Sequence, residues 1–479
     1  MDYEDPSQLS CFFEPRSIAI VGSFREAFFG GYVIVKSLLN AGYKGRIYPI
    51  NPAYKEVQGI KVCASLADIR DRIDLAIVMI NARSVAEMTQ AFSEKGVKAV
   101  IVVSDGFAER NAEGARLQEG LVELAAKLGI RVIGPNTAGV ANTANGFNPC
   151  PYEAGYYRIR KGSTAICAQT GMINPQAFPY PELRFGVSKI CDFGNKCDVD
   201  ECDMLAYLGE DPDTKVISMY LESIRDGQRF LAISKRVALE KPLLILKSGK
   251  TQEGAKASVS HSGGMAVDDK VFEAACRQAG VLRLTDFKEP FEIPKIFASQ
   301  PLPAGNRLGI VTFTGGVAVL AIDEGAKFDL ALTSLSVETA QMLNNIFPGF
   351  GKNPVDLGPV MAAVKDAFDR YPEILRTVLA DPNIDGLFNV LWANPSGNIV
   401  KRYLEAYEAL RGANSKPLVS WVYGPNPELS SELAARLEDM GFPVFRSPES
   451  AIKALGLAWR YAQWKRRAQT MGRGHVQAF

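Results

Sequence analysis

The sequence predicts an α/β protein in which three units, each built on a doubly wound parallel sheet, follow one another. Short apolar runs alternate with amphipathic stretches along most of the chain, and this alternation is typical of βαβ units. The same cycle begins again twice. With 479 residues, the chain is also longer than one hydrophobic core usually extends, which favours two or three domains of roughly 100 to 200 residues.

The first unit is expected over residues 1–150. It opens with the apolar strand SIAIVGS at 17–23, after which strands and amphipathic stretches alternate. Further strands are predicted at 46–52, 75–80, 98–104 and 131–136, and helices at 32–42, 83–95 and 112–128. Because a crossover through a helix leads to a parallel strand, the carboxyl ends of these strands should meet at one edge of the sheet.

The second unit is expected over 151–299 and the third over 300–479, with the proline-containing linker QPLPAGN at their boundary. Strands are predicted in the second at 163–170, 186–194, 216–223, 242–249 and 281–284, with a helix that begins near Met265. Strands are predicted in the third at 307–316, 386–393, 417–424 and 442–447, before a helix at 448–466. We assign no function to His475 in the basic tail that follows.

Composition argues against several classes of function. Lys and Arg number 54 against 53 Asp and Glu, so there is no basic excess for a nucleic acid or an anionic membrane. No apolar run reaches the ~20 residues of a membrane span, and the polar, acidic start differs from a signal peptide, which favours a cytoplasmic protein. The eight cysteines form no C-x-x-C pair, so neither disulfides nor zinc are expected. The acidic run at 192–203 lacks calcium-loop spacing and is better explained by helix capping.

His261 is one of only two histidines, and it lies in SVSHSGGM between a Lys-rich turn at 247–258 and the expected helix near Met265. At a helix start, the backbone N–H groups of Ser262, Gly263 and Gly264 would have no helical partners, and the two glycines would let an anion approach closely. An imidazole in this place could carry a phosphoryl group.

Two further features are expected at the same sheet edge. The strand at 163–170 runs into Gly171 at another expected helix start, so Thr170 and Gly171 could help a second helix N-terminus face the same phosphate. Glu222 ends the strand at 216–223, and its carboxylate could accept the Nδ1 proton of His261 and leave Nε2 as the nucleophile. The alternatives are glycines that only pack helices on strands, and a surface Glu that caps the following turn.

The first unit has its own candidate crevice. Its first strand ends in Gly22 and Ser23, and the chain reaches Gly30 and Gly31 before the next helix. This pattern resembles a phosphate-binding loop, but it lacks the G-x-G-x-x-G spacing. A simple tight turn between strand and helix explains the glycines equally well. A dehydrogenase, which would depend on this turn alone, is disfavoured. Later strands end in NP, VSDG and GPN, which should lie on the same edge.

Several long segments resemble a known family. In chain order they are IAIVG, YPINP, SLADIRDRIDLAIV, GVKAVIVVSDGFAE, VIGPN, ICDFGNKCDVDE, YLESIRDGQRF, LKSGKTQEGAKASVSHSGGMA and KNPVDLG. They cover nearly the whole chain and resemble the nucleoside-diphosphate-forming acyl-CoA synthetases. The likeness is closest to the α subunit of two-subunit ADP-forming acetate–CoA ligases, and the chain is more distantly similar to the succinyl-CoA synthetase α subunit.

The resemblance implies a Rossmann-like CoA-binding domain followed by two flavodoxin-like domains. It implies that His261 is the phosphorylated histidine and Glu222 its supporting carboxylate. The implied reaction interconverts carboxylic acid, CoA and ATP with acyl-CoA, ADP and phosphate, through an acyl phosphate and a phosphohistidine. The residues expected to contact CoA are Gly22, Ser23, Phe24, Asn51, Pro52, Val103, Ser104, Asp105, Pro135 and Asn136.

In this family ATP or ADP and Mg²⁺ are held by an ATP-grasp module. The three expected units use up the chain, so the resemblance implies a separate β subunit and an α2β2 heterotetramer. Two departures occur: Gly22, Ser23 and Phe24 stand where relatives commonly have G-A-S, and AQTG at 168–171 stands where they have S-Q-S-G. The alternative function is a catalytically silent CoA-sensing or scaffold protein, which the retained His261 argues against.

Overall fold

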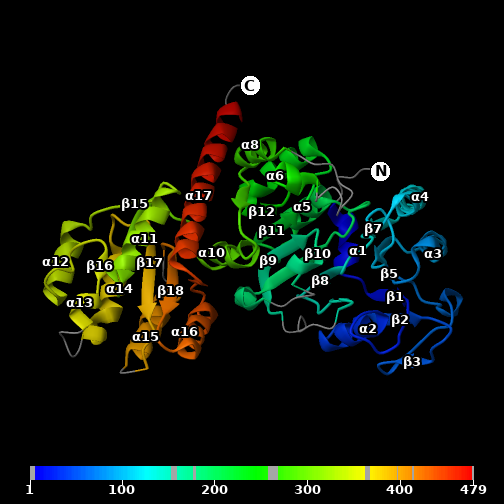
Figure 1. Ribbon diagram of the computed structural model, residues 1–479, viewed down its shortest axis with the longest axis horizontal. Coiled ribbons are helices and arrows are strands. Elements are labelled where there is room, and N and C mark those ends of the chain that lie inside the picture. Colours follow the sequence, from blue (N-terminus) through cyan, green and yellow to red (C-terminus); the bar gives the residue numbers. More distant parts are fainter. Residues whose placement is uncertain are drawn as a thin grey trace. The chain divides into compact units, whose positions relative to one another are not determined.

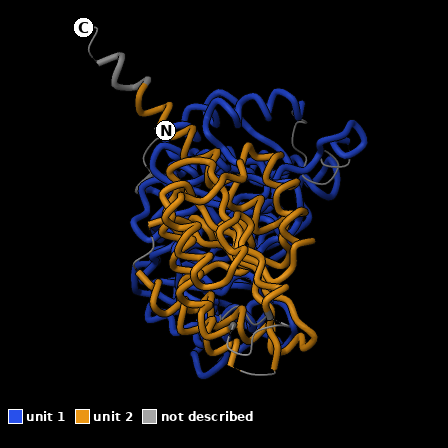
Figure 2. Tube along the Cα trace, turned by 90° about the vertical axis from the view of Figure 1, so that its left-hand side faces the viewer, with its two compact units in different colours: residues 1–291 blue, residues 292–479 orange. Residues whose placement is uncertain are grey.

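The computed structural model describes residues 6–152, 159–175, 180–256, 268–361, 367–395, 398–412 and 415–476. The chain forms two compact units, residues 1–291 and 292–479 (Figure 2). The first unit contains two large sheets and a small two-stranded one, and the second unit contains a third large sheet (Figure 1). Three large sheets thus follow one another along the chain, as the sequence predicts.

The first sheet is parallel throughout, with strand order β2-β1-β5-β6-β7. Its central strands are buried at every position because they are covered on both faces. The strands are β1 (Ser17–Val21), β2 (Arg46–Ile50), β5 (Leu75–Val78), β6 (Ala99–Val102) and β7 (Arg131–Ile133), and the connecting helices are α2 (Gly31–Asn40), α3 (Ala82–Glu94) and α4 (Ala112–Leu128). The order reverses at β1, which places a crevice at the carboxyl ends of β1 and β5.

The second sheet has the order β13-β12-β11-β9-β10-β8. It is not purely parallel, because β8 (Val140–Asn142) pairs antiparallel with β10 at one edge. This strand precedes residue 150, so the second sheet begins earlier than the expected boundary. The other strands are β9 (Lys161–Ala168), β10 (Val187–Asp192), β11 (Val216–Leu221), β12 (Leu243–Lys247) and β13 (Leu282–Leu284), and the main helices are α5 (Glu201–Glu210), α6 (Gly227–Glu240) and α8 (Asp269–Ala279).

One hydrophobic core joins the first two sheets. Its buried side chains come from β1, β5 and β6 as well as from β9, β10 and β11. Near the start of the chain, Phe13 stacks on Tyr207 of α5 with ring centroids 4.9 Å apart. The shared core explains why residues 1–291 form one unit although they contain two sheets.

The third sheet has the order β15-β14-β17-β18-β19, and β16 also pairs with β14. Its unit starts at Glu292, within the expected second domain: Lys295 on α10 (Pro294–Ser299) forms an ion pair with Glu438 at 2.7 Å. The strands are β14 (Arg307–Thr312), β15 (Ala331–Leu332), β16 (Val355–Asp356), β17 (Gly386–Trp392), β18 (Leu418–Tyr423) and β19 (Val444–Phe445). The helices are α11 (Gly315–Ala326), α12 (Val337–Ile346), α14 (Tyr371–Ala380), α15 (Ile399–Leu410), α16 (Pro427–Asp439) and α17 (Pro448–Val476).

Shorter elements complete the fold. They are η1 (Pro6–Leu9), α1 (Ser10–Phe13), β3 (Glu56–Val57), β4 (Ile60–Lys61), η2 (Leu66–Asp68), η4 (Gly171–Ile173), η5 (Pro181–Phe185), α9 (Glu289–Glu292), α13 (Gly358–Met361) and η6 (Ala367–Arg370). No helix in the described ranges is both long enough and apolar enough to cross a bilayer.

The helix expected to begin near Met265 begins four residues later. Asp268 is its N-cap, and its carboxylate accepts hydrogen bonds from the backbone N–H groups of Lys270 and Val271. A capping carboxylate satisfies two of the N–H groups that have no helical partner, which fixes the start at Asp269. His261, Ser262, Gly263, Gly264 and Met265 lie outside the described residues.

Candidate functional site

A cavity of about 490 Å³ lies at the carboxyl edges of the first two sheets. It is lined from both sides, so the residues predicted to bind the coenzyme and those predicted to bind phosphate share one space. The lining residues are Phe29, Met79, Ile80, Val103, Ser104, Asp105, Asn136, Thr137, Ala138, Tyr152, Gln169, Thr170, Gly171, Asp192, Gly194 and Asn195.

Ser104 ties together three strand ends on the first-sheet side. Its hydroxyl accepts a hydrogen bond from the Ile80 N–H at 2.9 Å, and its carbonyl accepts one from the Asn136 N–H, also at 2.9 Å. Asn136 has a φ of 57°, a left-handed conformation that Asn adopts more easily than most residues. The carboxyl ends of β5, β6 and β7 therefore form one continuous wall of the cavity.

The predicted residues of the first turn do not line the cavity. The Asn51 side chain donates to the Gly22 carbonyl at 2.8 Å, and the Ser23 hydroxyl is 3.0 Å from the hydroxyl of Tyr54. Phe24 is buried in the core against Tyr54. Of the predicted coenzyme contacts, those that do not line the cavity are Gly22, Ser23, Phe24, Asn51, Pro52 and Pro135.

Phe29, a few residues further on, lines the cavity and packs on Tyr152 with ring centroids 4.9 Å apart. Gly31 is required here because a Cβ at that position would lie 2.8 Å from the Ser23 carbonyl oxygen. The loop between β1 and α2 therefore reaches the cavity through Phe29 and not through Phe24.

On the second-sheet side, Gln169, Thr170 and Gly171 follow β9. The α-helix expected at Gly171 is a single 3₁₀ turn, Gly171–Ile173, whose N-cap Thr170 makes no side-chain capping bond. So short a turn carries less of a dipole than the expected helix. A Cβ built on Gly171 would meet no atom within 4 Å, so a ligand has room beside it.

Glu222 follows β11 and is buried, in contrast to the alternative of a surface Glu. Its carboxylate accepts a hydrogen bond from the Tyr220 hydroxyl at 3.3 Å. The Gln169 carbonyl oxygen accepts hydrogen bonds from the backbone N–H groups of Glu222 and Ser223 at 2.7 and 3.1 Å. Gln169 therefore connects the Thr170–Gly171 turn with the strand end that carries Glu222.

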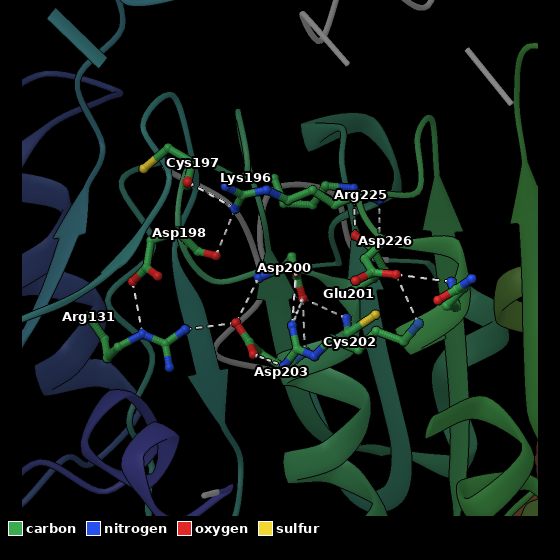
Figure 3. A network of polar contacts seen from close by, with 12 residues as sticks. Arg131, Lys196, Cys197, Asp198, Asp200, Glu201, Cys202, Asp203, Arg225 and Asp226 are labelled. Atoms are coloured by element: carbon green, nitrogen blue, oxygen red, sulfur yellow. Dashed lines mark hydrogen bonds and ion pairs between the residues drawn. The ribbon is translucent and has the colours of Figure 1, made fainter. Parts of the chain in front are cut away.

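Lys196 also stabilises the end of β11, next to Glu222. Its buried ammonium donates to the Ser223 carbonyl at 2.9 Å and forms an ion pair with Glu201 at 2.6 Å. The other Glu201 oxygen accepts the Arg225 N–H at 2.8 Å (Figure 3). A buried charge that is paired and hydrogen-bonded holds its neighbours firmly, because losing any contact leaves it unpaired.

The acidic run at 192–203 performs several structural tasks. Asp200 is the N-cap of α5, as the capping interpretation predicts, and burial raises its pKa from 3.8 to about 6. Arg131 of β7 bridges Asp198 at 2.9 Å and Asp203 at 2.7 Å (Figure 3). These contacts tie the first sheet to the second. Within the described ranges, no group of three or more His, Cys, Asp or Glu residues is placed to hold a metal ion.

Sequence reasoning missed Asp192, which ends β10 and lines the cavity. Its carboxylate accepts the Ala138 N–H at 2.7 Å and the Gly194 N–H at 3.1 Å. Burial, opposed in part by these two hydrogen bonds and assisted by the charge of Glu222, raises its pKa to about 6. The signal that identified Glu222, a carboxylate at the end of a predicted strand, applies equally to Asp192.

Comparison with protein-family models matches two segments of the chain. Residues 16–143 match a CoA binding domain, and residues 161–297 match a succinyl-CoA ligase like flavodoxin domain. The first segment contains the first sheet and the second contains β9 to β13. The cavity is lined from both segments.

Relatives and solved structures extend the likeness to the whole chain. The α subunit of the ADP-forming acetate–CoA ligase I of Pyrococcus furiosus is 34% identical, over 95% of this chain and 98% of its own. The ADP-forming acetate–CoA ligase II of Archaeoglobus fulgidus is 35% identical, over 98% of this chain and 69% of its own. The dinucleotide forming acetyl-coenzyme A synthetase 1 of Ca. Korarchaeum cryptofilum, solved with phosphate and ADP, superposes with a TM-score of 0.87 at 29% identity, over 97% of this chain and 98% of that one. This chain therefore belongs to the family of the ADP-forming acetate–CoA ligases and corresponds over nearly its whole length to their α subunit.

Proposed function

We propose that this chain is the α subunit of an ADP-forming acyl-CoA synthetase, which interconverts carboxylic acid, CoA and ATP with acyl-CoA, ADP and phosphate. The observation that carries the proposal is the single cavity in which Val103, Ser104 and Asn136 of the first sheet meet Thr170 and Gly171 of the second. A reaction between a coenzyme thiol and a phosphorylated acid requires that both ligands reach one space, and proximity of this kind lowers the barrier substantially.

His261 is proposed to carry the phosphoryl group. One ring nitrogen attacks the terminal phosphoryl group of ATP, an N–P bond forms and ADP leaves. The carboxylate of the acid then takes the phosphoryl group, which gives an acyl phosphate, and the CoA thiol displaces phosphate from it. Glu222, buried and anchored through Gln169, supports this role because an oriented carboxylate can accept the proton on the second ring nitrogen and stabilise the imidazolium.

The nucleotide and its Mg²⁺ are assigned to a partner chain with an ATP-grasp module. Two relatives carry the name of an α subunit, which supports a separate β subunit, and a heterotetramer with two copies of each chain is the assembly that the family resemblance implies. Sedimentation of the mixed subunits would measure this stoichiometry.

The test is to mix the chain with its β subunit, CoA, ATP and a panel of carboxylic acids, and to compare wild type with His261→Ala. Loss of a covalent nucleophile should abolish acyl-CoA formation, a fall of at least about 1,000-fold. His475→Ala is the matched control, because it removes the only other histidine, and it should retain wild-type activity.

Radiolabelled ATP provides the second readout. Wild type and His475→Ala should acquire an acid-labile, base-stable label, and His261→Ala should acquire none. CoA binding without any label on the wild-type chain would contradict the proposal and would indicate a CoA sensor.

A further inference from the structure

Asp192 is a buried carboxylate in the cavity to which the reaction above gives no role. It ends β10, beside the end of β9, with which it pairs in register at Ala168. On the other side of β9, β11 ends before Glu222. Two carboxylates therefore flank the Gln169–Gly171 turn, and Asp192 also contacts the loop that follows β7 of the first sheet, through the Ala138 N–H.

We propose that Asp192 is a further catalytic residue, which accepts the proton of the CoA thiol as the sulfur attacks the acyl phosphate. This inference rests on the proposed function. In the step, the sulfur–carbon bond forms, the bond between the acyl carbon and the phosphate oxygen breaks, and the thiol proton moves to the Asp192 carboxylate. The departing phosphate then takes this proton, so the carboxylate is regenerated and neither an oxidant nor a further reactant is needed.

The position of the carboxylate fits this role. Asp192 is only 3% exposed, and its two oxygens are held by N–H groups from two different loops, Ala138 at 2.7 Å and Gly194 at 3.1 Å. A base that is fixed by backbone donors needs little reorganisation before proton transfer. It lies between the wall predicted to hold the coenzyme and the turn predicted to hold phosphate, which is where the thiol must meet the acyl phosphate.

The electrostatic surroundings also fit. Among the described residues, the titratable groups that interact with Asp192 include Glu222 on the second sheet and Tyr152 and Cys150 before it, and Asp105 of the first sheet lines the same cavity. Within the described ranges Asp192 has no ion-pair partner, so burial dominates and raises its pKa to about 6. A base with a pKa near the working pH is effective because it is largely deprotonated and still basic enough to take a proton.

The experiment separates two half-reactions of the assembled enzyme. The first is phosphorylation of the chain by ATP without CoA. The second is formation of acetyl-CoA from acetyl phosphate and CoA, or from the acyl phosphate of whichever acid wild type accepts. Asp192→Asn should retain the first and lose at least about 100-fold in the second, which is the usual range for a general base. Glu210→Gln, which removes an exposed carboxylate of α5 outside the cavity, is the matched control and should retain both.

The pH profile distinguishes catalysis from a structural role. For wild type, kcat/KM for CoA in the second half-reaction should fall as the pH drops through about 6, because the carboxylate becomes protonated. In Asp192→Asn this limb should be absent. Since Asn can accept only one of the two N–H bonds, Asp192→Ser, which is smaller and keeps an acceptor, is the second variant if the first fails to fold.

Equal losses of rate in both half-reactions would show that Asp192 only holds the loops. The same conclusion would follow if kcat/KM for CoA still fell at low pH in the variant. Either result would overturn the inference. A wild-type chain that never becomes phosphorylated would instead contradict the proposed function itself.

Discussion

The side chain of Lys196 is 4% exposed and that of its partner Glu201 is 0% exposed, so both charges depend on each other for stabilisation. Lys196 also has a φ of 57°, an unfavourable conformation for a side chain with a Cβ that the surrounding contacts must offset. Lys196→Met should keep this backbone and leave the Glu201 carboxylate buried without its cation. We expect a loss of about 3 kcal/mol in the free energy of unfolding, measured in urea.

The double variant Lys196→Met with Glu201→Gln is the control for this prediction. It removes both charges, so the measured loss should be smaller than for Lys196→Met alone. A double variant that is less stable than the single one would show that packing and not charge makes Lys196 important.

Asp192 gives a second prediction at this scale, for stability against pH. Its pKa is 3.8 in the unfolded chain and about 6 in the folded one, so the folded state holds a proton between these values that the unfolded state lacks. The stabilisation is therefore complete below about pH 4 and is lost as the pH rises through 6. Lowering the pH from 7 to 5 should stabilise wild type by about 1 kcal/mol relative to Asp192→Asn, as urea unfolding at the two pH values would measure. If the difference in unfolding free energy between wild type and Asp192→Asn is the same at both pH values, the pKa of Asp192 is not raised in the folded chain and the prediction is wrong.

Individual cavity residues were predictable where it was enough to know that the carboxyl ends of parallel strands meet at one edge of a sheet. Ser104, Asn136, Thr170 and Gly171 line the cavity as the edge of parallel strands requires. Phe24 does not, because whether an aromatic side chain turns into the core or toward a ligand depends on packing partners such as Tyr54, which are remote in sequence.

At the scale of elements, α4 shows how one position can fix a loop beside the cavity. A Cβ at Gly114 would lie 1.9 Å from the carbonyl oxygen of Phe107, whereas one at Gly120 in the same helix would meet nothing within 4 Å. Gly114→Ala should therefore displace the loop that follows Val103–Asp105, cost about 3 kcal/mol in unfolding free energy and weaken CoA binding, as calorimetry would measure.

Gly120→Ala is the internal control, since it is exposed and should stabilise the helix by about 1 kcal/mol. Equal effects of the two substitutions would mean that helix propensity and not the close approach to Phe107 determines the role of Gly114.

Strands were predicted best where the apolar run is uninterrupted, as in β5 and β6, and helices where the hydrophobic period is long and regular, as in α4. Their ends were predicted less well. The helix α8 starts at Asp269, where the Asp268 carboxylate caps its first N–H groups, and the turn at Gly171 stops after three residues. Periodicity reports which face of an element is buried, but a cap or a break is decided by one or two side chains.

At the scale of the whole molecule, the order of three α/β sheets follows from the sequence, but their grouping does not. The core that joins the first two sheets is built from residues as distant as Phe13 and Tyr207, and no local pattern reveals which sheets will share a core. The antiparallel strand β8 was missed for the same reason, because three buried residues carry too little periodicity to identify a strand.

The grouping into units leads to a last prediction. Every described residue that lines the cavity lies between Phe29 and Asn195, within the unit formed by residues 1–291. The last residues of this unit are held within it, because the Ser218 hydroxyl donates to the Pro290 carbonyl at 2.9 Å. A chain truncated after residue 291 should therefore fold, and it should bind CoA with a Kd within about fivefold of the full chain, because fivefold corresponds to only about 1 kcal/mol. Calorimetric titration of both chains measures this. If the truncated chain folds cooperatively but binds CoA far more weakly than the full chain, residues 292–479 supply part of the coenzyme site, and the cavity at the first two sheets is incomplete.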